Sequence, residues 1–387
     1  MPKPTAPADT NHLVHGLAGD DIAPDWPALV APELRALLHR FPQAGALRQL
    51  LWHSPRPLSA ACLVETEADT LFVKRHHQQV RSTATLAEEH RFIAHLRQHG
   101  LPLAEVLRDA GSDSAIAIGD WVYEVHRRVA GIDLYRELIS WQPLPNPNHA
   151  RRAGRMLAQL HDAAADYTAP QRRTHILVAR SELIVAADPV ATLAAQLPQR
   201  PGLADYLRGR PWQREFAELL APWHVRLQPA LARQPRLWTH GDWHASNLCW
   251  SGSGDGADIT AVLDFGLAAA NCALFDLATA IERNAIAWLA LDTGAAAIHP
   301  SIARALIEGY REIRPLDSDE LHLLADLLPL VHVDFALSEV EYFHAITHAP
   351  AHADVAWDTF LRGHAAWFRT SAGQALLQTI RALAAGA

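Results

Sequence analysis

The chain is poor in cysteine and has no long apolar stretch without a charge. Its three cysteines, Cys62, Cys249 and Cys272, are widely separated and form no Cys-x-x-Cys pair. This pattern argues against a disulfide framework and favours a reducing, cytoplasmic setting with small buried thiols. No run reaches roughly 18 apolar residues, so we expect no membrane span. The N-terminal residues also lack the apolar core of a signal peptide, which again favours a cytoplasmic location.

Positive charge is in deficit. The 34 Lys and Arg residues are outnumbered by 42 Asp and Glu, and the formal net charge is −8. This balance argues against broad nucleic-acid binding and favours neutral or cationic partners, although a local basic site remains open. The apolar content of 49% and charged content of 20% are those of an ordinary globular protein. The 387 residues suffice for two lobes, each with its own core.

Residue patterns divide the chain into three parts. Residues 1–25 are rich in Pro, Ala and Asp without periodicity, and we expect a loose arm there. Residues 26–130 alternate short apolar runs with turn residues, and Gly131 begins a mostly helical region, 131–387. The patterns predict helices at 26–40, 83–98 and 149–163, and strands at 47–52, 58–65, 70–76, 115–118 and 121–125. These patterns alone predict an α+β chain.

Three polar residues interrupt apolar segments in the second half of the chain. Asp242 and Asn247 lie five positions apart in the stretch 237–250, each after apolar residues. Asp264 follows the strand-like run 259–263. Polar groups in buried surroundings are tolerated when they are hydrogen-bonded or metal-bound. An Asn with two Asp residues offers the hard oxygen ligands that Mg²⁺ shares with substrate phosphates.

These residues resemble motifs of the aminoglycoside phosphotransferase/choline kinase-like family, relatives of the protein kinases. The stretch HGDWHASN at 240–247 is similar to the family's catalytic loop, H-G-D-x-x-x-x-N. The stretch DFG at 264–266 is similar to its metal-binding element, and Asp276 stands in a similar D-L-A context. The resemblance implies a bilobal kinase-like fold, with residues 26–130 as the nucleotide-binding lobe and 131–387 as the catalytic and substrate-binding lobe.

The resemblance also implies a role for each residue. Asp242 would position the acceptor hydroxyl and take its proton, while Asn247 and Asp264 would hold Mg²⁺ against the phosphates of ATP. His240 would hydrogen-bond backbone near Asp264, and Asp276 would brace the catalytic loop. For each residue alone, a turn or cap role is the plain alternative. His244 is left open between the acceptor site and packing.

Lys74 ends an apolar run, where it can contact the α- and β-phosphates if a carboxylate holds it in place. Glu89 on the predicted helix 83–98 is the candidate carboxylate, and its neighbour Glu88 remains an alternative. The predicted phosphate-covering loop departs from the family, because the stretch SPRPLS at 54–59 has no glycine and contains two prolines that lack an N–H. We consider the hydroxyls of the loop's serines, or Arg56, as substitutes. The use of ATP rather than GTP is not fixed.

The acceptor site is expected in the helical C-terminal lobe. Residues 332–368 mix carboxylates with aromatic rings, a combination that suits a cationic amine, although an amphipathic helical layer is the favoured interpretation. The chain also has 23 histidines. His344, His348 and His352 are spaced by four, but Pro350 would break their helix, so we interpret them as surface histidines rather than a metal site.

The sequence therefore predicts a small-molecule kinase that transfers the γ-phosphoryl group of Mg-ATP to a hydroxyl group. The acceptor is left open among aminoglycosides, choline-like alcohols, amino alcohols and sugars, and the oligomeric state is also open. Two alternatives are a metal-dependent phosphohydrolase, to which the stretch GDWH at 241–244 is loosely similar, and a non-catalytic kinase-like nucleotide-binding protein.

Overall fold

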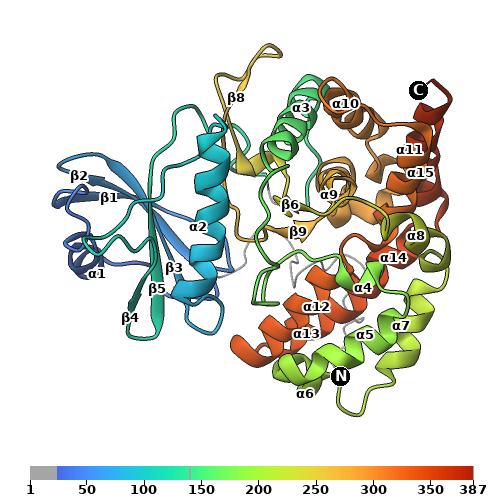
Figure 1. Cartoon of the computed structure of the whole chain (residues 1–387), viewed down its shortest axis with the longest axis horizontal. Coiled ribbons are helices and arrows are strands. Elements are labelled where there is room, and N and C mark those ends of the chain that lie inside the picture. Colours follow the sequence, from blue (N-terminus) through green and yellow to red (C-terminus); the bar gives the residue numbers. More distant parts are fainter. Residues whose placement is uncertain (1–23, 139–140, 387) are drawn as a thin grey trace, which may run out of the picture.

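The computed structural model describes residues 24–138 and 141–386, which form two lobes lying side by side (Figure 1). The predicted arm at 1–25 falls almost wholly outside these residues. The smaller lobe contains a sheet and two helices, and the larger lobe is mostly helical. The predicted α+β, bilobal kinase-like fold is confirmed.

The small lobe is built on a five-stranded antiparallel sheet with strand order β1-β2-β3-β5-β4. Its elements are β1 (Leu47–His53), β2 (Ala60–Thr66), β3 (Thr70–His77), β4 (Ile116–Ile118) and β5 (Trp121–Arg127), with helices α1 (Ala31–Leu38) and α2 (Thr83–Gln98). The predicted strands and helices therefore form, with ends that shift by a few residues. The predicted helix at 26–40 is shorter, because α1 begins only at Ala31.

The two helices of the small lobe have different partners. Leu34, Leu37 and Leu38 of α1 join the sheet residues Val64 and Val73 in one apolar cluster. Helix α2 begins at the N-cap Ser82, whose hydroxyl accepts from the main-chain N–H of Thr85 at 3.2 Å. The same helix places Phe92, Ile93 and Leu96 in the core of the large lobe. Helix α2 thus lies between the sheet and the large lobe (Figure 1).

Gly131 lies where the chain enters the large lobe. Its φ is +102°, and a Cβ added there would overlap the side chain of Thr260 and crowd the main-chain oxygen of Trp250. Only glycine meets both requirements, positive φ and close backbone approach. The mostly helical region that the sequence predicts from Gly131 onward therefore begins where the backbone passes close to Trp250 and Thr260 of the large lobe.

The large lobe surrounds two small antiparallel ribbons, β6 with β9 and β7 with β8. These strands are β6 (Leu237–Thr239), β7 (Leu248–Trp250), β8 (Ile259–Val262) and β9 (Ala269–Asn271). The α-helices are α3 (Pro147–Ala163), α4 (Glu182–Val185), α5 (Pro189–Gln196), α6 (Pro201–Tyr206), α7 (Trp212–Leu220), α8 (His224–Leu231), α9 (Ala273–Ala285), α10 (Pro300–Arg311), α11 (Ser318–Leu327), α12 (Val333–Glu341), α13 (Pro350–Val355), α14 (His364–Trp367) and α15 (Ser371–Ala382). Helix α9 is buried along nearly its whole length, so it forms the centre of this lobe.

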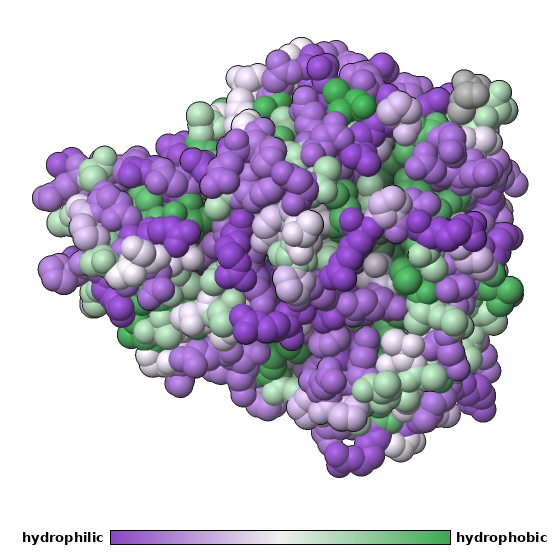
Figure 2. All heavy atoms as spheres, in the orientation of Figure 1, coloured by the Kyte–Doolittle hydropathy of each residue, from purple (hydrophilic) through white to green (hydrophobic). Residues whose placement is uncertain are grey.

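Polar side chains cover most of the face shown in Figure 2, with apolar residues in small, scattered groups. Among the helices that the structure describes, none is both long and apolar enough to cross a membrane. The apolar residues instead gather in the cores of the two lobes.

Candidate active site

The loop after β6 is held in place by a buried carboxylate on α9. Asp276 accepts hydrogen bonds from the main-chain N–H groups of His240 (2.8 Å) and Gly241 (2.9 Å). His161 on α3 adds a third contact, with Nε2 at 3.1 Å from Asp276 Oδ2. Burial by itself raises the pKa of Asp276, but the contact with His161 and the backbone donors lower it overall. Asp276 thus remains ionised and fixes the start of the loop.

The other end of α9 braces the same loop. Asn284 accepts from the N–H of Ala245 at 3.0 Å and donates to the main-chain oxygen of Trp243 at 2.8 Å. A side-chain amide with both functions can replace a backbone partner on each side of a loop. Nothing in the local sequence marked Asn284, because its partners lie about 40 positions away and only the folded helix brings them together.

His240 connects the two functional loops. Its Nε2 lies 2.8 Å from the main-chain oxygen of Leu263, the residue before Asp264. Its Nδ1 accepts from the N–H of Asp242 at 3.2 Å. These bonds define the tautomer, with the proton on Nε2. The contact that the sequence predicts for His240, with backbone near Asp264, is present.

Asp242 and Asn247 face each other across the loop. The Nδ2 of Asn247 donates to the main-chain oxygen of Asp242 at 2.9 Å and approaches its Oδ2 at 3.3 Å. His244 and Arg283 lie at 3.4 Å and 3.5 Å from the carboxylate. Burial raises the pKa of Asp242, but the charges of His244 and Arg283 lower it well below its usual range. The carboxylate therefore stays ionised, and His244 lies beside it.

Asp264 stands at the end of the second loop in an unusual backbone conformation, with φ +54°. Its Oδ1 accepts from the N–H of Gly266 at 3.2 Å and from Lys74 Nζ at 3.0 Å. Partial loss of water around the carboxylate raises the pKa of Asp264 and the charge of Asp242 adds to this, but the ion pair with Lys74 lowers the pKa overall. Since the side chain is 42% exposed, the carboxylate opens to solvent. The N–H of Leu263, the residue before Asp264, donates to the main-chain oxygen of Asn247 at 2.8 Å, and Asn247 contacts Asp242, so the structure brings the three residues close together.

The structure does not bring Lys74 and Glu89 into an ion pair within the described residues. Lys74 pairs with Asp264, while Glu89 lies 3.7 Å from the guanidinium of Arg172. Glu89 is still close enough for its charge to raise the pKa of Lys74. Glu88 pairs with Arg173 at 2.5 Å and also lies 3.4 Å from Arg172. Of the two candidates, Glu89 remains the one directed toward the lysine, and its partner in this state is an arginine that the sequence did not indicate.

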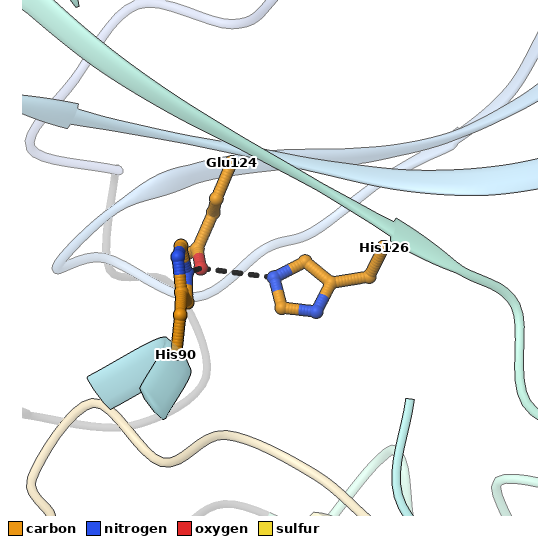
Figure 3. Close-up of side chains that lie close together, drawn as sticks. All are labelled: His90, Glu124 and His126. Atoms are coloured by element: carbon orange, nitrogen blue, oxygen red, sulfur yellow. Dashed lines mark hydrogen bonds and ion pairs between the residues drawn. The ribbon is translucent and has the colours of Figure 1, made fainter. Parts of the chain in front are cut away.

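A second carboxylate lies directly across the sheet from Lys74. Glu124 on β5 pairs with Lys74 of β3 in the strand register, and its charge also raises the pKa of Lys74. Three imidazoles hold this buried carboxylate: His90 at 2.8 Å and His76 and His126 at 2.9 Å each (Figure 3 shows His90 and His126). His90, Glu124 and His126 are a group of residue types that can bind metal. Here the imidazoles are hydrogen-bonded to the carboxylate, and the cluster orders the strand beside Lys74.

The glycine-free loop between β1 and β2 places Arg56 across the gap between the lobes. One Nη of Arg56 donates to Ser246 Oγ at 2.9 Å, in the catalytic loop, and to the main-chain oxygen of Leu138 at 2.8 Å. The charges of Asp242 and Asp264 both act on its pKa, although burial outweighs them and lowers it. Arg56 thus lies close to both carboxylates of the site.

The predicted cationic-amine site in residues 332–368 does not form as a row of open carboxylates. Arginines pair with Glu341 (Arg200, 3.0 Å) and with Asp354 (Arg210, 2.7 Å). The amphipathic interpretation fits residues 350–368, where buried and exposed positions alternate, but not α12, whose carboxylates Asp334, Glu339 and Glu341 are buried. Pro350 begins α13, so it separates His344 from His352 as expected. None of the three spaced histidines belongs to a metal-type cluster in the described part of the chain.

Two adjacent loops thus deliver two carboxylates and an amide to one point below a strand lysine, between a small β lobe and a large helical lobe. This combination defines a phosphotransferase of the protein kinase-like fold. Comparison with known proteins agrees with this class. The chain belongs to the phosphotransferase enzyme family, whose model matches residues 57–316. It is an enzyme that uses a nucleotide to phosphorylate the hydroxyl group of a small molecule, as the sequence predicted.

Curated relatives include two bacterial homoserine kinases. The enzyme of Methylobacterium radiotolerans is 27% identical over 246 residues, covering 64% of this chain and 66% of the relative. The enzyme of Parvibaculum lavamentivorans is 26% identical over 289 residues, covering 74% and 78%. The chain therefore spans between about two thirds and four fifths of these relatives.

Solved structures share the fold at low identity. An aminoglycoside phosphotransferase from Alicyclobacillus acidocaldarius has a TM-score of 0.52 at 16% identity, with 94% of this chain and 98% of that chain covered. The amicoumacin kinase hAmiN, solved with AMP-PNP, Ca²⁺ and Ami, has a TM-score of 0.55 at 14% identity, with 84% and 92% covered. A microcompartment-associated aminopropanol kinase has a TM-score of 0.54 at 17% identity, with 89% and 98% covered.

Proposed function

We propose that this enzyme transfers the γ-phosphoryl group of Mg-ATP to the hydroxyl group of a small amino alcohol of the homoserine type. The observation that carries the proposal is the convergence of Asp242, Asn247 and Asp264 from two loops. The homoserine kinases among the relatives support this class of acceptor over a sugar or a choline-like alcohol. The need for ATP and the three buried free thiols support a cytoplasmic location.

Asp242 acts on the acceptor. Its ionised carboxylate accepts a hydrogen bond from the hydroxyl, aims the oxygen at the γ-phosphorus, and takes the proton as the new P–O bond forms and the bond to the β-phosphate oxygen breaks. The fixed loop makes this orientation persistent, since Asp276 and Asn284 hold both of its ends. Positioning of this kind accounts for much of the catalysis in phosphoryl transfer.

Asn247 and Asp264 have the chemistry to hold Mg²⁺. The amide of Asn247 uses Nδ2 toward Asp242, which leaves its Oδ1 for a cation. Asp264 adds an anionic oxygen that opens to solvent. When bound, Mg²⁺ would neutralise charge on the phosphates. His240 and Asp276 support the loop rather than contact substrate.

Lys74, Glu89 and Arg56 serve the nucleotide. Lys74 would exchange its contact with Asp264 for the α- and β-phosphates, with Glu89 as its nearby carboxylate. Arg56 would supply the phosphate donors that the proline-containing loop lacks. Because backbone groups would hold the base, the side chains do not distinguish ATP from GTP.

The test compares the wild type with Asp242→Asn and Asp264→Asn, and with Asp292→Asn as an exposed control. ADP formation is followed with L-homoserine, and nucleotide binding is measured by calorimetry. We expect Asp242→Asn to lower kcat by about 10²–10⁴-fold while it retains nucleotide binding. Asp264→Asn should lose Mg²⁺-dependent nucleotide binding, and Asp292→Asn should match the wild type.

Turnover by Asp242→Asn close to that of the wild type would disprove the mechanism. Release of phosphate from a monoester without nucleotide would support a phosphohydrolase. The phosphotransferase family model and the homoserine kinases among the relatives favour the kinase over that alternative. Nucleotide binding without transfer to a broad acceptor panel would indicate a non-catalytic protein.

A further inference from the structure

Arg283 lies beside the proposed catalytic carboxylate on a pair of aromatic rings. Its Nη2 is 3.5 Å from Asp242 Oδ1. The central carbon of its guanidinium lies 3.9 Å from the ring centroid of Trp141 and 5.4 Å from that of Phe335. Only 5% of the residue is exposed. The aromatic rings therefore fix the plane of a cation immediately next to Asp242.

The hydrogen-bonding capacity of this guanidinium is almost unused. Its ion pairs, to Asp242 at 3.5 Å and to Glu282 at 3.7 Å, are longer than hydrogen bonds of good geometry. Nε is enclosed and has no hydrogen-bond partner. Within residues 24–138 and 141–386, no hydrogen bond is formed by the side chain of Arg283. Because buried donors are normally satisfied, a guanidinium in this state is prepared for an anionic group that is not part of the chain.

The position of Arg283 favours the acceptor over the nucleotide. Lys74 dominates the charges that act on Asp264, whereas His244 and Arg283 dominate those that act on Asp242. Lys74 comes from the small lobe, while Arg283 comes from α9 and rests on rings of the large lobe. Lys74 thus contacts Asp264, and Arg283 lies beside Asp242, the carboxylate proposed to act on the acceptor hydroxyl.

We propose that Arg283 binds a carboxylate of the acceptor, so that the substrate is a hydroxy compound bearing a carboxylate close to its hydroxyl group. This inference rests on the proposed function and narrows its substrate class. A planar guanidinium matches the two oxygens of a carboxylate, and the enclosed surroundings strengthen the pair. A carboxylate held there leaves a hydroxyl a few bonds away within reach of Asp242.

The same site is unfavourable for a polycationic acceptor. Arg283 and Arg56 both act on Asp242, and both would repel ammonium groups brought to its hydroxyl side. The rings of Trp141 and Phe335 beside Asp242 already carry this cation of the protein. The charge of Arg283 thus favours an anionic group of the acceptor over a cationic one at this position.

The experiment uses matched acceptors that differ only in the carboxylate: L-homoserine against 3-amino-1-propanol, and L-serine against ethanolamine, with kanamycin as a polycation. Steady-state kinetics with Mg-ATP are measured for the wild type, Arg283→Gln, Arg283→Lys and the exposed control Arg304→Gln. We expect the wild type to prefer a carboxylate-bearing compound by about 100-fold or more in kcat/KM. Arg283→Gln should lower kcat/KM for the carboxylate-bearing compound by about 30-fold or more, mainly by raising its KM. The preference for that compound over its decarboxylated partner should then be largely lost. Arg283→Lys should recover part of it, and Arg304→Gln should retain it.

A wild-type preference for the decarboxylated compounds or for kanamycin would overturn the inference, as would an unchanged preference in Arg283→Gln. Thermal-shift titration with L-homoserine, in the presence of Mg-AMP-PNP, separates this inference from the proposed function. Asp242→Asn should still bind L-homoserine, and folded Arg283→Gln should not. Binding that depends on Arg283 without any transfer would refute the proposed function alone. Transfer to acceptors without a carboxylate would refute the inference alone.

Discussion

At the level of single residues, the active site is arranged by arginines as much as by the carboxylates of the motifs. Arg56 reaches the catalytic loop from the small lobe, and Arg283 reaches Asp242 from the large lobe. Arg81 adds a buried link, since it donates to the main-chain oxygens of Leu177 at 2.7 Å and Gly266 at 3.0 Å. These cations balance the negative charge of Asp242 and Asp264, which would otherwise repel each other.

The position of Arg56 leads to a prediction about nucleotide binding. Arg56→Gln should raise the KM for ATP by about tenfold or more, because a charge-assisted contact to phosphate contributes roughly 1.5–3 kcal/mol. The control is Arg48→Gln, which removes an exposed arginine of neighbouring β1. Initial rates measured at varied ATP concentration give the KM of each variant. An equal KM in the two variants would mean that the loop binds phosphate without Arg56.

At the level of elements, α9 and the pair α3–α10 decide where the catalytic loop lies. Helix α9 holds the loop through Asp276 near its start and Asn284 near its end. Helices α3 and α10 cross with their backbones in contact at Gly154 and Gly309. A Cβ on Gly154 would overlap the carbonyl of Leu306, and one on Gly309 would overlap that of Arg151. Helix α3 also carries His161, the partner of Asp276.

This crossing reverses the usual effect of replacing a helical glycine. In an open helix, Gly→Ala stabilises by roughly 1 kcal/mol. Gly154→Ala should instead lower the free energy of unfolding by about 1–3 kcal/mol or more, because α10 must move away. The control is Gly363→Ala, where a Cβ meets only the Asp358 carbonyl at 3.4 Å. Urea unfolding measures both. A stabilised Gly154→Ala variant would contradict the close crossing.

At the level of the whole molecule, buried histidines couple stability to pH. His332 is buried in the large lobe, where its Nε2 lies 3.0 Å from the main-chain oxygen of Leu361. Burial, together with the charge of His364, lowers the pKa of His332 to about 4. The unfolded value is about 6.5. Protons therefore bind the unfolded chain first as the pH falls.

This difference sets the sign of the pH dependence. The contribution of neutral His332 is complete above about pH 6.5 and is lost progressively as the pH falls toward about 4. His332→Asn should flatten the decline in unfolding free energy across this window by up to about 1.4 kcal/mol per pH unit. His322→Asn, at an exposed position, should leave the slope unchanged. Urea titrations at several pH values test this, and equal slopes in all three proteins would contradict it.

The sequence by itself determined the class of the protein and the outline of its lobes. Alternation and helical spacing located the strands of the small lobe, because these signals come from residues close together in the chain. The motifs at 240–247 and 264–266 were equally local, so Asp242, Asn247 and Asp264 could be selected before their convergence was known.

Only the tertiary structure decided which charges surround those residues. Lys74 pairs with Asp264 rather than Glu89. Arg283 comes from a position with no motif, and the contact of Arg56 with Ser246 could not be read from its loop. Asn284 meets the loop only because α9 packs beneath it. Contacts of this kind depend on which side chains the folded backbone places within a few ångströms of one another. The strength of an electrostatic interaction depends on the distance between the charges in space. The separation of the two residues along the chain does not determine that distance.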